Sequence, residues 1–233
     1  MLNLDPELSK QENFLAGQVL LIDKPLEWTS FDAVKKIRNN IKIKKVGHAG
    51  TLDPLATGLL IICTGKMTKQ IDTFMGQEKE YTGTFTIGQT TPTYDLESEP
   101  SVALDISHIS QEHLEEARMQ FVGEISQTPP IHSAIKVDGR RVYELARKGE
   151  EVKLKSRHVI ISEFELTKVD LPIIEFKVVC SKGTYIRSLA NDFGEKLGVG
   201  AHLSSLRRTR IGEFSVDNAH QLDQLVEFLK ELA

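Results

Sequence analysis

The sequence predicts an α+β fold with a mixed, largely antiparallel central sheet that is flanked by helices and loops. Strand-like segments dominate the middle of the 233-residue chain, and helical segments interrupt them irregularly, without a regular βαβ rhythm. A hydrophobic content of 40% is sufficient for a sizeable core. We expect a flexible N-terminal arm over residues 1–15 and a single domain over 16–233, with a basic excursion from the main body at about 124–152.

In the first third of the chain, strands and helices are short and well marked. Residues 17–22 form an apolar strand, and a Thr-Ser pair can cap a helix over 31–39. The apolar run 59–63 reads as a buried strand, and 67–75 as a short helix. These elements predict the first part of the sheet with its covering helices.

The middle of the chain contains a strand with period two and then an amphipathic helix. In residues 80–87 the alternation places Tyr81, Phe85 and Ile87 on one face. A polar loop follows, and residues 111–121 have the pattern of a helix with one apolar side. We therefore expect this strand to be buried on the face that carries its aromatic residues.

The excursion follows a Thr-Pro-Pro break. Residues 131–137 can form a strand, 138–139 a tight turn and 142–147 a helix. Two strands over 159–169 and 173–180 return the chain to the sheet.

After those strands, a Ser-Lys-Gly-Thr turn leads into a helix whose apolar residues recur at helical spacing from Ile186 to Phe193. Residues 202–214 mix helical and strand signals, and 221–232 predict a closing helix. The end of the chain is therefore less clearly assigned than its middle.

Charge is unevenly distributed. The net charge of −4 argues against a protein that coats nucleic acid non-specifically, although local fields matter more than the sum. We interpret the separation of basic and acidic clusters as a basic face with an acidic back, the alternative being ordinary solvated surface charge. The basic clusters are Lys35, Lys36, Arg38, Lys42, Lys44 and Lys45; Arg140, Arg141, Arg147 and Lys148; and Arg207, Arg208 and Arg210.

Cysteine usage and apolar run lengths indicate the cellular environment. Cys63 and Cys180 lie in apolar strand-like runs and are expected to be buried, reduced and structural. No Cys/His spacing resembles a zinc site, no run approaches the ~20 apolar residues of a membrane span, and residues 1–12 do not resemble a secretory signal. We expect a cytoplasmic protein that does not associate with membranes.

The most informative segment is the glycine-rich loop Gly-His-Ala-Gly-Thr-Leu-Asp-Pro-Leu-Ala-Thr-Gly at residues 47–58, which we call the Asp53 loop. Glycines allow a close approach of the backbone to a ligand, and Pro54 restricts the single carboxylate of Asp53. A structural turn capped by Asp53 is the alternative, because Asp-Pro is common in turns. The loop is therefore either a turn or a catalytic segment.

If Asp53 is catalytic, the surrounding sequence limits its role. No Ser/His constellation or companion carboxylate accompanies it, so neither a hydrolase triad nor a Mg²⁺ or Ca²⁺ site is suggested. An isolated acid acts most simply as a nucleophile or as a general acid/base, and a buried one needs a cation, for which Arg187 is a candidate. The residues alone indicate an acid-dependent enzyme with an anionic substrate.

The Asp53 loop resembles the signature loop of the TruB family of tRNA pseudouridine synthases. Further matches occur in the family's order between about residues 18 and 214. They are Ile-Asp-Lys-Pro at 22–25, Lys-Glu-Tyr at 79–81, Gln-Thr-Pro-Pro-Ile-His-Ser-Ala-Ile-Lys-Val at 127–137, Tyr-Glu-Leu-Ala-Arg at 143–147, Ser-Lys-Gly-Thr-Tyr-Ile-Arg-Ser-Leu at 181–189 and Leu-Arg-Arg-Thr at 206–209.

The resemblance implies the pseudouridine synthase fold and the isomerisation of uridine 55 in the tRNA T loop, without metal or organic cofactor. It implies that Asp53 attacks the target nucleotide or assists glycosidic cleavage after the base leaves its stack. Tyr81 would stack on the flipped uracil, and Arg187 would pair with Asp53 and keep it ionised.

For substrate binding, the resemblance implies stacking by His48 and a base pocket lined by Tyr185 and Leu206. Lys24, Arg141, Arg147 and Arg207 would contact the RNA, which makes affinity dependent on salt. It further implies a monomer and a short form without the C-terminal PUA domain of longer members. His132 stands where the family pattern leads us to expect tyrosine or phenylalanine.

Two other functions remain as alternatives. One is a non-catalytic RNA-binding protein or tRNA-folding chaperone on the same scaffold, against which the presence of Asp53, Tyr81 and Arg187 argues. The other is a metabolic enzyme for a phosphorylated small molecule, which the spread of basic clusters along the whole chain disfavours.

Overall fold

The computed structural model describes residues 4–131, 136–137, 140–141 and 154–232. Two compact units are present: a first unit of Met1–Tyr81 with Leu206–Ala233, and a second unit of Thr82–Ser205. That the units act as a single domain over 16–233 stays a prediction. Each is described by itself below.

The first unit contains a mixed sheet, as predicted. β1 (Val19–Lys24) runs antiparallel to β3 (Ala56–Thr64) and parallel to β12 (His220–Gln221). On its other side β3 pairs in parallel with β10 (Ala201–Ile211), and β10 neighbours β4 (Lys79–Ile87). Two short strands, β2 (Val46–His48) and β11 (Phe214–Ser215), add to β3 and β10.

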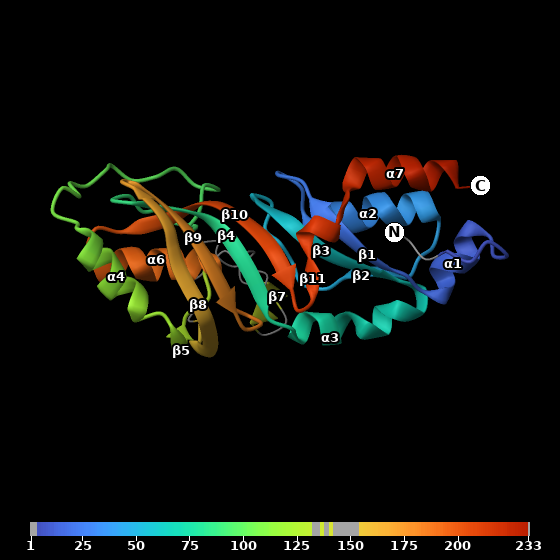
Figure 1. The fold of residues 1–233 in the computed structure, drawn as a ribbon, viewed down its shortest axis with the longest axis horizontal. Helices are drawn as coiled ribbons and strands as arrows, with labels where there is room; N and C mark the ends of the chain where they lie inside the picture. The colour runs from blue at the N-terminus through green and yellow to red at the C-terminus, as the bar shows by residue number, and fades with distance from the viewer. Residues whose placement is uncertain (1–3, 132–135, 138–139, 142–153, 233) are drawn as a thin grey trace. The chain divides into compact units, whose positions relative to one another are not determined.

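Helices cover both faces of this sheet (Figure 1). α2 (Ser30–Ile41) and α7 (Leu222–Glu231) pack with Leu60 and Ile62 of β3 in one apolar core cluster. The alternate β3 residues Leu59, Ile61 and Cys63 belong to a second cluster. η1 (Gly65–Gln70) and α3 (Ile71–Gly76) contribute to that second cluster. Burial on both faces explains why the predicted strand is a continuous apolar run.

α1 (Lys10–Ala16) lies in the stretch for which the sequence analysis expects a flexible arm. Ser9 and Glu12 form a capping box at its start, and Phe14 is fully buried in the core of the first unit. At least this part of the stretch is therefore ordered against the sheet.

The second unit is built on antiparallel strands. β8 (Arg157–Asp170) lies between β5 (Gly123–Gln127) and β9 (Ile173–Cys180) and is antiparallel to both. α4 (Gln111–Met119) and α6 (Ile186–Leu197) belong to the same unit. Phe193 of α6 packs on the rings of Phe85 in β4 and Phe164 in β8. Phe85 in turn stacks on Phe176 of β9. The predicted buried faces of β4 and α6 are thereby confirmed.

The segment before the closing helix differs from the prediction, and part of the excursion lies outside the described residues. The segment 202–214, expected to mix helix and strand signals, is strand over most of its length, because β10 covers Ala201–Ile211 and β11 begins at Phe214. β6 (Lys136–Val137) and β7 (Arg140–Arg141) pair antiparallel. The predicted turn at 138–139 and helix at 142–147 lie outside the described residues.

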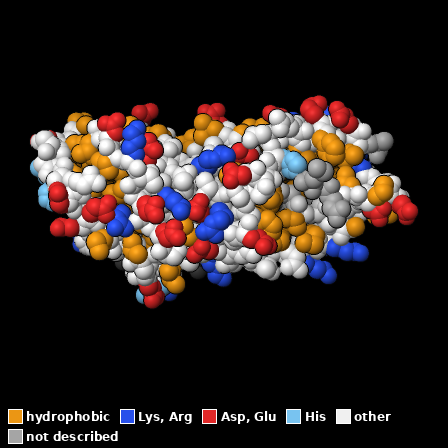
Figure 2. All heavy atoms as spheres, in the orientation of Figure 1, with side chains coloured by type: hydrophobic (Ala, Val, Ile, Leu, Met, Phe, Trp, Pro, Cys, Tyr) orange, Lys and Arg blue, Asp and Glu red, His pale blue; other side chains and the backbone are white. Residues whose placement is uncertain are grey.

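On the face drawn in Figure 2, acidic and basic side chains are interspersed. Ion pairs of the described residues include Arg118 with Glu115 and Lys177 with Glu163. A basic face with an acidic back stays a prediction. None of the described helices combines the length and the apolar composition that crossing a membrane requires.

Candidate active site

The Asp53 loop connects β2 to β3 in the first unit and is fixed by its own turn and by neighbouring segments. The backbone N–H of Ala56 donates to the Asp53 carbonyl at 3.1 Å, and the N–H of Glu27 donates to the Pro54 carbonyl at 2.9 Å. Asp53 itself is half-buried. The loop is therefore held in one conformation with the carboxylate partly accessible.

Ser30, the first residue of α2, anchors the centre of the loop. Its hydroxyl donates to the Leu52 carbonyl at 3.2 Å and accepts from the Leu52 N–H at 2.8 Å. Ser30 is only 2% exposed. The residue directly before Asp53 thus has both backbone groups bound to one buried side chain.

Lys24 anchors the other side of Asp53. This fully buried ammonium donates to the carbonyls of Pro25 at 2.9 Å, Trp28 at 2.6 Å and Pro54 at 3.4 Å. Burial lowers the pKa of Lys24 to about 8, against the opposing effect of the Asp53 carboxylate. Lys24 is thus a buried positive charge near Asp53 that is hydrogen-bonded to the loop at Pro54, and its contact with the substrate stays a prediction.

Arg208 of β10 is a third buried anchor and was not identified from the sequence. Its guanidinium donates to the carbonyls of Leu59 at 2.7 Å, Gly50 at 3.2 Å and Thr51 at 3.5 Å. The sequence does not distinguish the buried Arg208 from Arg207 and Arg210, which are partly exposed, because all three belong to one run of basic residues.

His48 belongs to the Asp53 loop, and Leu206 lies beside the end of the loop on the neighbouring strand. His48 ends β2, and its pKa is lowered by burial and by the charge of Arg208. Leu206 of β10 is in register with Ala56 at the end of the loop. The fold brings Leu206 to the Asp53 loop, and the contacts of both residues with a base stay predictions.

Tyr81 and Arg207 are the remaining predicted site residues of the first unit. Tyr81 is 9% exposed on β4. Arg207 forms a bidentate pair with Asp23 at 3.0 and 2.7 Å, and Gln221 also donates to Asp23 at 3.0 Å. Arg207 is thus neutralised by a carboxylate in this structure, while its side chain remains 40% exposed.

Arg187 lies at the start of α6 in the second unit and is buried. Its Nη1 lies 3.4 Å from Oδ2 of Asp95 and donates to the Thr93 carbonyl at 3.4 Å. Asp95 in turn accepts from the Glu97 N–H at 3.0 Å. Asp95 was not identified from the sequence as a site residue, because its partner Arg187 is distant in the chain. The predicted pairing of Arg187 with Asp53 stays a prediction.

Tyr185 precedes α6, and its backbone is held by the side chain of Gln127. Gln127 accepts from the Tyr185 N–H at 2.8 Å and donates to its carbonyl at 3.0 Å. The Arg157 guanidinium lies 4.7 Å from the centre of the Tyr185 ring. Tyr185 is half-buried, and its contact with a base stays a prediction.

The side chains of the two arginines predicted to bind RNA in the excursion are not among those that the structure describes. Arg141 belongs to β7, and Arg147 and His132 lie outside the described residues. Their contacts with RNA stay predictions.

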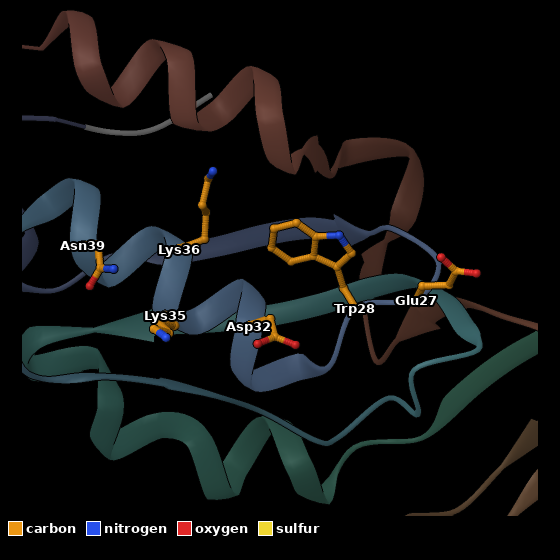
Figure 3. A pocket seen from close by; sticks show the side chains of 6 residues that line it. All are labelled: Glu27, Trp28, Asp32, Lys35, Lys36 and Asn39. Atoms are coloured by element: carbon orange, nitrogen blue, oxygen red, sulfur yellow. The ribbon is translucent and has the colours of Figure 1, made fainter. Parts of the chain in front are cut away.

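A pocket of 380 Å³ lies on α2 and the turn before it. Figure 3 shows the ring of Trp28 among the side chains that line it: Glu27, Asp32, Lys35, Lys36 and Asn39. Asp53 is not part of its lining. Glu27 nevertheless connects this surface to the Asp53 loop through its backbone N–H, which donates to Pro54, and Lys24 donates to the carbonyls of both Trp28 and Pro54.

The described residues do not bring together three His, Cys, Asp or Glu side chains in a group that could hold a metal ion. At the Asp53 loop one carboxylate, two buried cations and an imidazole lie close together.

Two family models match the chain over most of its length. Residues 38–186 match the TruB family pseudouridylate synthase (N terminal domain), and residues 187–232 match the tRNA pseudouridylate synthase B C-terminal domain.

Similar proteins carry corresponding names. A "tRNA pseudouridine synthase B" of Flavobacterium johnsoniae is 56% identical over 226 residues, which are 94% of this chain and 99% of the relative. One of Parabacteroides distasonis is 54% identical over 225 residues, with 94% and 96% coverage. A chain of the "Crystal Structure of a Cbf5-Nop10-Gar1 Complex" superimposes with a TM-score of 0.73 at 29% identity; the match covers 99% of this chain and 62% of that one.

Proposed function

The chain belongs to the TruB family of pseudouridylate synthases, and from this membership we propose that it isomerises uridine 55 in the T loop of tRNA to pseudouridine. The observation that supports the proposal most is the construction of the Asp53 loop, in which buried side chains of three elements fix the residues on both sides of one carboxylate. Such preorganisation is what a positioned catalytic acid requires.

The reaction exchanges one bond for another without oxidation or reduction. The bond between N1 of uracil and C1′ of ribose breaks, the base turns, and C5 bonds to C1′. The C5 proton is released and N1 takes up a proton, so that the product is an isomer of the substrate. Asp53 either attacks the nucleotide or assists cleavage, and both routes need an ionised carboxylate.

The base must leave its stack before Asp53 can reach it, which costs a few kcal/mol. In the proposed complex His48 takes the place of the everted base by stacking, and Tyr81 stacks on the uracil. The lowered pKa of His48 favours the neutral imidazole, which suits stacking rather than phosphate binding.

The T stem-loop is the proposed partner because the first unit offers exposed cations, including Lys35 and Lys36 on α2. We place the reaction in the cytoplasm, in keeping with the burial of both cysteines in the apolar interior.

The test uses unmodified tRNA labelled with tritium at C5 of uridine, and a matched tRNA with cytidine at position 55. We expect release of tritium from the first RNA, no release from the second, and modification of an isolated T stem-loop. Binding of both RNAs without release from either would support the alternative of a non-catalytic RNA-binding protein or tRNA chaperone. Equal release from both would contradict the assignment to uridine 55.

A further inference from the structure

We propose that Arg208 is a positioning residue, which holds the Asp53 loop in its reactive conformation through the carbonyls of Gly50 and Thr51. The inference rests on the proposed function, because it concerns how the loop of that reaction is kept in place. Residues behind an active site commonly hold the reacting group in position through hydrogen bonds, and we infer this role for Arg208.

The first argument is the burial of a permanent charge. Arg208 is 1% exposed, and among the ion pairs of the described residues none includes it. Removing a guanidinium from water without a carboxylate partner is costly unless its N–H groups are bound. Here carbonyl oxygens bind them, and two of the three belong to the Asp53 loop.

The second argument is the shape of the guanidinium. Nε donates to Leu59, in the middle of the sheet, while Nη1 and Nη2 reach the first half of the loop. Because the group is planar and rigid, it fixes the loop relative to β3. A lysine at this position would keep the charge but has no such fork.

The third argument is that two glycines of the loop accommodate Arg208. A Cβ on Gly58 would lie 2.3 Å from the backbone carbonyl oxygen of Arg208, its partner in register on β10. Gly50, with φ of +95°, presents its carbonyl to the guanidinium. Gly58 thus allows the close approach of the β10 backbone at Arg208, and Gly50 adopts the backbone conformation that directs its carbonyl to the guanidinium.

The loop has further anchors that do not depend on Arg208. Ser30 binds Leu52, and Lys24 binds Pro54. Loss of the Arg208 fork therefore releases residues 50 and 51 while the other contacts keep the loop folded. The expected consequence is a misplaced Asp53 in a protein that still folds and still binds RNA.

The experiment compares Arg208→Lys with Arg210→Lys, a change of the same kind two residues along β10. Arg210 contacts Glu78, Glu80 and the Gly212 carbonyl at the surface. The single-turnover rate constant is measured with saturating enzyme in excess over C5-tritiated tRNA. This quantity does not depend on the fraction of enzyme that is folded, so a purely structural role would leave it unchanged.

For Arg208→Lys we expect a loss of about 10- to 100-fold in that rate constant, with tRNA affinity within about threefold of wild type. Arg210→Lys is expected to react at the wild-type rate. If Arg208→Lys cannot be purified folded, Arg208→Gln is measured in its place with the same expected loss.

A second comparison tests whether Arg208 acts through the loop. Ser30→Ala removes the anchor at Leu52, and we expect its effect on the rate constant to be non-additive with that of Arg208→Lys, because both changes free the same segment. Additive effects would contradict action through a shared loop.

If the wild-type enzyme releases tritium and the Arg208 variant does so at the same rate, the inference about Arg208 is overturned while the proposed function stands. Absence of release by the wild-type enzyme would instead overturn the proposed function. The two failures are therefore distinguishable in one set of measurements.

Discussion

Arg187 and Asp95 form an ion pair inside the second unit, with Nη1 and Oδ2 3.4 Å apart and both side chains at most 5% exposed. The carboxylate comes from a loop and the guanidinium from the start of α6, far apart in the sequence. Asp95 is thus a counter-ion of the arginine to which the family resemblance gives a catalytic role.

Asp95→Asn is expected to destabilise the protein, because it removes the charge of one partner from a buried ion pair. Loss of one partner of a buried pair costs about 3–5 kcal/mol in the free energy of unfolding, which denaturant titration measures. Glu163→Gln, which breaks the exposed pair with Lys177, is the control and should cost less than about 1 kcal/mol. Similar small losses for both variants would show that the buried pair carries no special stability.

Lys24 makes stability depend on pH in a defined window. The pKa of Lys24 is lowered from 10.5 to about 8 in the folded protein, so the unfolded chain binds more protons between these values. The free energy of unfolding of wild type relative to Lys24→Met should be constant below about pH 7. It should then rise by about 3 kcal/mol as the pH increases from about 8 to about 10.5.

Thermal or denaturant unfolding of both proteins across this range gives the difference directly. Lys36→Met, at an exposed lysine of α2, is the control for loss of a charge. A difference between wild type and Lys24→Met that does not change with pH would contradict the burial of the ammonium.

Arg207 can serve the RNA only by sharing its charge between Asp23 and a phosphate. If it contacts a phosphate in the complex, Arg207→Gln should reduce the steepness of log Kobs against log salt by about 0.7–0.9. The slope is obtained from tRNA binding at several salt concentrations. An unchanged slope, with loss of stability, would show that Arg207 serves only the Asp23 pair.

Much of the sheet is predictable from sequence because burial leaves a pattern. β3 is a continuous apolar run since both of its faces are covered, and β4 alternates because one face packs on the aromatic cluster. β10 is not clearly predictable, because Arg208 points inward within a run of arginines that resembles a surface. The capping box of Ser9 and Glu12 is a signal by which α1 could have been found.

The candidate site divides in the same way. Asp53 is recognisable from the composition of its loop, whereas the anchors Ser30 and Arg208 become apparent only when the fold brings them to it. Asp95 is missed for the same reason, since its partner is distant in the chain. Single-sequence patterns report local burial and turns, and they do not report which buried polar groups meet.

The carboxylate of Asp53 is required for the proposed isomerisation. Tritium release from C5-labelled tRNA, measured for wild type and for Asp53→Asn, tests this requirement. The account predicts rapid release by wild type and none above background by Asp53→Asn, with equal tRNA binding and equal unfolding temperatures. Release by Asp53→Asn at the wild-type rate would contradict it.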